Sequence, residues 1–143
     1  MKFKNFIKIF FAILFVFVST NSYAKTIKWS MQGDSLTLDP HAQNEGPTTQ
    51  VSRQVYEALV TRGLDMSIEP QLATDWKTTD PNTWIFNLRK DVKFSDGSNM
   101  TAKDVVFSIL RAKQPTSDFK EYISTISGVK AIDDYTVQIK TSK

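Results

Sequence analysis

The first pattern along the chain is an apolar block that follows a basic start. Lysines precede an unbroken apolar run from Ile9 to Val18, and small or polar residues follow from Ser19 to Ser22. This order is typical of a secretory signal peptide. The run is about half of the roughly 20 residues that a membrane-spanning helix needs, so we expect cleavage and not an uncleaved anchor. Small side chains at Ser22 and Ala24 predict that the cut follows Ala24.

Alternation of apolar and polar residues predicts strands further along. Period two runs from Thr26 to Met31 and again from Thr83 to Leu88, as in a strand with one buried face. We expect Val92 to Phe94 to continue that second sheet segment. The segments Val129 to Ile132 and Thr136 to Ile139 flank a polar turn, which predicts a β-hairpin.

Helical spacing of apolar residues marks a first helix that opens at Gly46-Pro47-Thr48. Proline is tolerated in a first helical turn, where its missing N–H has no partner to lose. The apolar stripe of this helix comprises Val51, Val55, Ala58 and Leu59. Gly63 is expected to end the helix, and Arg53 and Glu57 are expected to pair on its outer face.

A second helix is predicted from about Ala102 to Lys113. Thr101 followed by Asp104 has the spacing of a variant capping box, and Pro115 lies just beyond the end. Phe119 to Ile126 is a candidate for a shorter helix. Strands and helices joined by short connections predict a mixed α/β (α+β) lobe.

Charge changes the picture once the signal peptide is removed. Residues 1–24 form the predicted signal peptide and residues 25–143 the predicted mature domain. The chain has 18 basic and 15 acidic residues, and three of the lysines lie before Ala24. The mature part is therefore formally neutral, so the composition does not favour nucleic acid as a partner. Cysteine is absent, which excludes a disulfide scaffold, a thiolate metal site and a lipoprotein cysteine.

Candidate catalytic residues are few. His41 is the single histidine, no serine lies in a nucleophile-elbow sequence, and a second histidine or cysteine for zinc is absent. We interpret His41 as a loop histidine after Pro40. Asp39, Asp133 and Asp134 are better explained as residues that hydrogen-bond the local backbone in turns. Neither an enzyme nor a cofactor is therefore expected.

Several motifs resemble the peptide/nickel-type solute-binding family, the extracellular solute-binding proteins family 5, across nearly all of the mature chain. The motifs are Leu38-Asp39-Pro40, Tyr56-Glu57-Ala58-Leu59-Val60, PQLATDW from Pro70, WIFNLRKDVKFSDG from Trp84, TAKDVVFS from Thr101 and IDDYTV from Ile132. Most of these motifs look like scaffold that packs a lobe. The resemblance implies the first lobe of a two-lobed clamshell, the class II type of periplasmic binding protein, which closes over its solute.

The resemblance also implies a solute site. The loop after Leu38-Asp39-Pro40 reaches the cleft in peptide-binding relatives, which maps onto Asn44, Glu45 and Gly46, and Phe119 is a further candidate. Some relatives place an acidic residue where Asn44 stands, so the neighbouring Glu45 is the candidate to substitute for it in holding a peptide's ammonium group. The alternative for this loop is a solvent-exposed connector before a helix.

The implied function is capture of peptides or similar solutes in the periplasm for an inner-membrane ABC transporter permease, by a protein that is monomeric when full length. Family members run to several hundred residues, so we expect this chain to represent the first lobe, either as a fragment or as a truncated product. Two alternatives from other classes stay open. One is a stand-alone secreted domain without solute binding, and the other is a small exported hydrolase centred on His41.

Overall fold

The computed structural model describes residues 25–142. The predicted signal peptide and its cleavage after Ala24 lie outside these residues. Residues 31–142 belong to one compact unit, and residues 25–30 belong to another. The strand predicted from Thr26 to Met31 is wrong: the segment has no regular secondary structure, and Ile27 and Trp29 are exposed. A strand needs a hydrogen-bonding partner, and no described strand pairs with this segment.

A four-stranded antiparallel sheet forms the centre of the larger unit. Its strands are β3 (Ala73–Asp80), β4 (Thr83–Leu88), β5 (Ile126–Asp133) and β6 (Thr136–Thr141). The order across the sheet is β3-β4-β6-β5. The strand predicted from Thr83 to Leu88 and the closing hairpin are both confirmed.

Cross-strand pairing explains why period two specifies this sheet. Trp84 lies opposite Ile139, and Phe86 lies opposite Val137, so apolar residues of β4 and β6 share one face. Val137 is fully buried in the core cluster. The opposite face carries Asn87, Gln138 and Lys130 together with Ile85, and is thus mostly polar, as expected for an antiparallel sheet that is solvated on one side.

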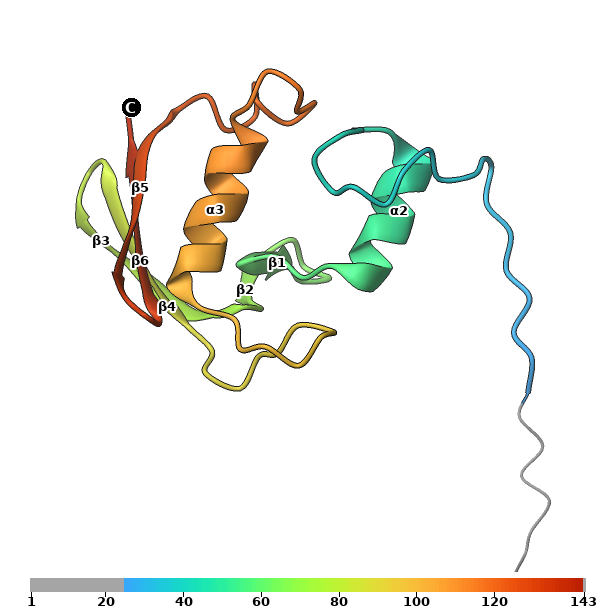
Figure 1. Cartoon of the computed structure of the whole chain (residues 1–143), viewed down its shortest axis with the longest axis horizontal. Helices are drawn as coiled ribbons and strands as arrows, with labels where there is room; N and C mark the ends of the chain where they lie inside the picture. Colours follow the sequence, from blue (N-terminus) through green and yellow to red (C-terminus); the bar gives the residue numbers. More distant parts are fainter. Residues whose placement is uncertain (1–24, 143) are drawn as a thin grey trace, which may run out of the picture. The chain divides into compact units, whose positions relative to one another are not determined.

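Helix α3 (Ala102–Ala112) lies against the apolar face of the sheet (Figure 1). The Asp104 carboxylate accepts hydrogen bonds from the Thr101 backbone N–H at 2.7 Å and from the Thr101 hydroxyl at 2.9 Å. Val105 is buried in the same core cluster. The predicted second helix and its capping box are therefore confirmed.

The first predicted helix is shorter than expected. Helix α2 covers Gly46–Val55, and the chain then becomes extended and enters β1 (Val60–Arg62), which pairs with β2 (Ile68–Pro70). The backbone explains the early end, because the C=O groups of Ala58 and Leu59 accept hydrogen bonds from the segment Gln71 to Ala73.

Because α2 ends at Val55, the buried apolar stripe predicted for this helix does not form as expected. Val55 and Ala58 are exposed, not buried. Glu57 lies outside the helix, so its expected i, i+4 pairing with Arg53 does not occur. The hydrogen bonds between residues 58–59 and residues 71–73 thus override the helical spacing of the apolar residues in this segment.

Two smaller elements also differ from expectation. Residues 92–100 fold back on themselves through a single bridge between Lys93 and Asn99 and do not extend the large sheet. Phe119 to Ile126 is a series of turns closed by i to i−3 backbone hydrogen bonds and not a helix. The phenylalanine predicted to contact solute thus lies in a turn that follows α3.

Candidate functional site

The loop that leads into α2 is organised by Asp39. The Asp39 N–H donates to the Thr37 hydroxyl at 3.0 Å, and the Asp39 Oδ1 accepts the His41 N–H at 3.0 Å. Short side chains of this kind often satisfy backbone groups within two residues and fix a turn. The predicted local role of Asp39 is confirmed.

Asp39 also forms a long-range ion pair that the sequence did not reveal. The guanidinium of Arg111, in the last turn of α3, donates from Nη1 to Asp39 Oδ1 at 2.8 Å and from Nη2 to Asp39 Oδ2. This two-pronged contact, with the His41 N–H, lowers the pKa of Asp39 from its ordinary 3.8 to about 2. The loop before α2 is therefore tied to the end of α3.

His41 belongs to the same cluster. Its Nδ1 lies 3.1 Å from Arg111 Nη1, and its backbone C=O accepts the Asp118 N–H at 3.0 Å. Partial burial, followed by the nearby Arg111 charge, lowers the pKa of the imidazole, which Asp39 opposes. A neutral His41 whose Nδ1 faces Arg111 can accept that hydrogen bond.

The three predicted loop residues lie at the start of α2. Glu45 is the N-cap of the helix, and its Oε1 accepts the Thr48 N–H at 2.8 Å. Within residues 25–142 no hydrogen bond reaches its second carboxylate oxygen. Asn44 and Gly46 are exposed, whereas Glu45 is half-buried.

Phe119 follows the buried Ser117, whose hydroxyl accepts the Phe119 N–H at 3.1 Å. The Phe119 ring packs against that of Tyr122, with 6.1 Å between the ring centroids. It also lines an open hollow of about 280 Å³ between the Phe119 turn and α2. We call this the α2 hollow; the other residues that line it are Pro40, Gln43, Thr49, Ser52, Arg53, Tyr56, Glu57 and Ala58.

The structure brings only one of the four predicted site residues to this hollow. Phe119 lines the hollow. The lining does not include Asn44, Glu45 or Gly46, although it includes the preceding residue, Gln43. Sequence reasoning missed Gln43 and Tyr56. Tyr56 lies just past the helix end, where its hydroxyl donates to the Leu38 C=O at 2.8 Å, and the overlong helix prediction hid this placement.

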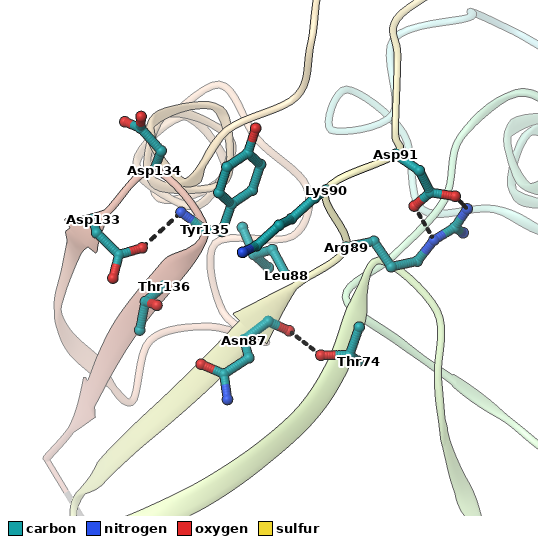
Figure 2. A pocket seen from close by; sticks show the side chains of 10 residues that line it. All are labelled: Thr74, Asn87, Leu88, Arg89, Lys90, Asp91, Asp133, Asp134, Tyr135 and Thr136. Atoms are coloured by element: carbon teal, nitrogen blue, oxygen red, sulfur yellow. Dashed lines mark hydrogen bonds and ion pairs between the residues drawn. The ribbon is translucent and has the colours of Figure 1, made fainter.

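A larger hollow of about 730 Å³ lies where β4 ends and β6 begins (Figure 2). Its charged groups are largely engaged with their neighbours. Arg89 pairs with Asp91 through two hydrogen bonds, Asp133 accepts the Tyr135 N–H at 2.8 Å, and Lys90 lies 5.6 Å from the centre of the Tyr135 ring. These contacts stabilise the surface, and the predicted turn role of Asp133 is confirmed.

The chemistry available at the α2 hollow is that of recognition. Amide, hydroxyl and guanidinium groups offer hydrogen bonds, and two aromatic rings offer apolar contact. Across residues 25–142, no group of three His, Cys, Asp or Glu side chains could hold a metal ion. In the same residues, no helix is both long and apolar enough to cross a bilayer.

Comparison with known proteins points to one family. The model of the bacterial extracellular solute-binding proteins, family 5 (middle), matches residues 67–143. The periplasmic oligopeptide-binding protein OppA of Escherichia coli K12 is 35% identical over 126 residues, which cover 75% of this chain and 23% of OppA.

Solved structures agree in fold. The murein tripeptide binding protein MppA of Escherichia coli has a TM-score of 0.75 at 32% identity, with 79% of this chain and 26% of that chain covered. NikZ from Campylobacter jejuni, in complex with Ni(L-His), has a TM-score of 0.69 at 26% identity, with 78% and 23% covered. These relatives are binding proteins, and this chain spans about a quarter of their length. The predicted mixed α/β lobe of a periplasmic binding protein is confirmed.

Proposed function

This chain belongs to family 5 of the bacterial extracellular solute-binding proteins, and from that premise we propose that it contributes to an ABC transporter component that captures peptides. The α2 hollow is the observation that carries this proposal. Its lining combines hydrogen-bonding groups such as Gln43, Thr49 and Ser52 with the rings of Tyr56 and Phe119. The hydrogen-bonding groups can satisfy the backbone of a peptide, and the aromatic rings can contact side chains of varied shape.

The relatives favour peptides over other solutes. OppA is named for oligopeptides and MppA for a murein tripeptide, whereas NikZ was solved with a nickel–histidine complex. Among residues 25–142 the single histidine and the absence of a metal-binding group offer little to a nickel complex. Peptide therefore ranks first as the solute of this chain.

The proposed contacts are those of Asn44, Glu45, Gly46 and Phe119. Glu45 uses one carboxylate oxygen to cap α2, which leaves the other oxygen to receive the ammonium group of a peptide. A charged acceptor of this kind forms a stronger hydrogen bond than a neutral one. Phe119, which lines the α2 hollow, supplies apolar contact.

The proposed setting is the periplasm, reached through a signal peptide cleaved after Ala24 and without a lipid anchor. The protein would act as a monomer, close over its solute and deliver it to a permease in the inner membrane. It would need no cofactor and no nucleic acid. Delivery depends on a closed form that the permease distinguishes from the open one.

Peptide binding is the direct test. The protein purified from its own cells is mixed with a randomised tetrapeptide pool and examined by native mass spectrometry, and calorimetry then follows one retained peptide. Phe119→Ala should weaken binding, whereas Phe107→Ala, which alters an exposed ring on α3, should not. N-acetylation of the peptide should weaken binding to wild type and have little effect on Glu45→Gln.

Failure of these tests would support the stand-alone secreted domain instead. A protein that melts cooperatively, retains no peptide from the pool and shows no shift in melting temperature would contradict peptide capture. Equal losses in Phe119→Ala and Phe107→Ala would show that the α2 hollow is not the site.

A further inference from the structure

The ion pair between Asp39 and Arg111 links the loop before α2 to the last turn of α3. The Arg111 guanidinium reaches Asp39 across 72 residues of sequence and contacts His41 Nδ1 at 3.1 Å. A bidentate contact between a guanidinium and a carboxylate fixes the relative orientation of the two groups as well as their distance, because both hydrogen bonds must be kept at once. The end of α3 and the loop that opens α2 are thereby held in one geometry.

The cluster also joins the two segments that carry the proposed solute contacts. On one side, the loop runs from His41 directly to Asn44, Glu45 and Gly46. On the other side, the His41 C=O accepts the Asp118 N–H, and Phe119 follows immediately. Arg111 itself is not among the residues that line the α2 hollow, and its contacts are with Asp39 and His41.

The other ion pair of residues 25–142 offers a direct contrast. Arg89 and Asp91 also form a two-pronged contact, with hydrogen bonds of 3.1 and 3.0 Å, but they are two residues apart and hold no distant segment. The exposed fractions of the arginine side chains are alike, at 39% for Arg89 and 40% for Arg111. Asp39, at 33% exposed, is better shielded than Asp91, at 72%.

We propose that Arg111 is a positioning residue for the solute site: by gripping Asp39 and His41 it fixes the loop 44–46 relative to Phe119 before the solute arrives. Without the contacts of Arg111, the loop would have to be ordered when the solute binds, and the entropy cost of that ordering lowers the affinity. This inference rests on the proposed peptide capture. It assigns Arg111 no contact with the solute.

The test compares Arg111→Gln with Arg89→Gln in the protein purified from its own cells, using one tetrapeptide retained by wild type. Arg111→Gln should weaken the dissociation constant about tenfold, in line with loss of charged hydrogen bonds that order a loop. Arg89→Gln should remain within about twofold of wild type. Asp39→Asn preserves side-chain shape and should weaken binding by a similar factor, and the double variant with Arg111→Gln should be no weaker than either single variant.

His41 supplies a spectroscopic readout that a general loss of stability would not produce. The NMR signal of the His41 imidazole is identified as the signal that is missing from the spectrum of His41→Gln. Arg111 and Asp39 are the charged groups that act on this ring. Removing the Arg111 cation should raise the pKa of His41 in folded Arg111→Gln, whereas Arg89→Gln should leave it unchanged.

The outcomes separate the inference from the function on which it rests. If wild type binds a tetrapeptide and Arg111→Gln binds it equally well, the positioning role is wrong and peptide capture stands. If Arg111→Gln does not fold, Asp39→Asn decides in the same way. If wild type retains no tetrapeptide, peptide capture fails and the inference fails with it.

Discussion

The ion pair between Asp39 and Arg111 makes a pH-dependent contribution to stability. Contacts with Arg111 and the His41 N–H lower the pKa of Asp39 from 3.8 to about 2. At about 1.4 kcal/mol per pKa unit, this difference corresponds to about 2 to 3 kcal/mol as an upper bound. The Asp39 side chain is 33% exposed, and solvent screening reduces the expected contribution to about 1 kcal/mol.

The sign follows from the direction of this shift. Because the pKa of Asp39 is lower in the folded protein, the unfolded chain binds the proton more readily. The stabilisation is complete well above pH 4, falls as the pH drops from about 4 towards 2, and is lost below both values. At most about half of it should remain at pH 3.

Urea unfolding of wild type and Asp39→Asn at several pH values measures this contribution. Asp39→Asn should lower the free energy of unfolding by about 1 kcal/mol at pH 7, and the difference should be at most about half as large at pH 3. Asp91→Asn, in the exposed local pair, is the matched control and should show no resolvable change. Equal stability of wild type and Asp39→Asn at pH 7, or a difference that does not narrow by pH 3, would show that the Asp39 carboxylate does not stabilise the fold through this ion pair.

Three further predictions concern the scaffold that holds the site, and each is measured as a change in the free energy of unfolding. Asp104→Ala removes the acceptor that caps α3 and should cost about 1 kcal/mol; an unchanged stability and unchanged helix content by circular dichroism would show that the cap is dispensable. Val137→Ala opens a cavity at a fully buried position and should cost about 2 to 3 kcal/mol, whereas Ile132→Ala, at an exposed position of β5, should cost well under half of that. Gly97 has a φ of 88°, so Gly97→Ala should cost about 1 kcal/mol; Gly46→Ala, where an added Cβ meets no atom within 4 Å, is the control, and equal effects of the two would count against backbone strain.

Local signals that agreed with tertiary packing were predicted well. The alternation in β4 matches its pairing with β6, because Trp84 and Phe86 meet Ile139 and Val137 on the buried face. Thr101 and Asp104 are three residues apart and close a capping box within one turn. In each case, residues adjacent in sequence suffice to specify the element.

The end of α2 shows where such signals fail. Val55, Ala58 and Leu59 have helical spacing, yet Ala58 and Leu59 hydrogen-bond to the segment from Gln71 to Ala73. Pairing of this kind depends on a segment more than ten residues away, and it outweighs the intrinsic helix preference of Ala58 and Leu59, because tertiary contacts override propensities of this size. The exposed Val55 is the visible consequence of the early end.

The candidate site depends on still longer contacts. Phe119 was found through resemblance to the family, and it lines the α2 hollow. Arg111 reads in the sequence as an ordinary basic residue in the last turn of a helix. Only the fold brings it to Asp39 and His41, so a pattern based on neighbouring residues could not have identified it.

The most direct test of peptide capture is a native mass spectrum of this protein released from the periplasm of its own cells without added ligand. We predict that the protein is present in that fraction, that its chain begins at Lys25, and that it carries a single bound peptide released on denaturation. Absence of the protein from the fraction, or a protein whose native mass equals its denatured mass before and after exposure to a tetrapeptide pool, would contradict the account.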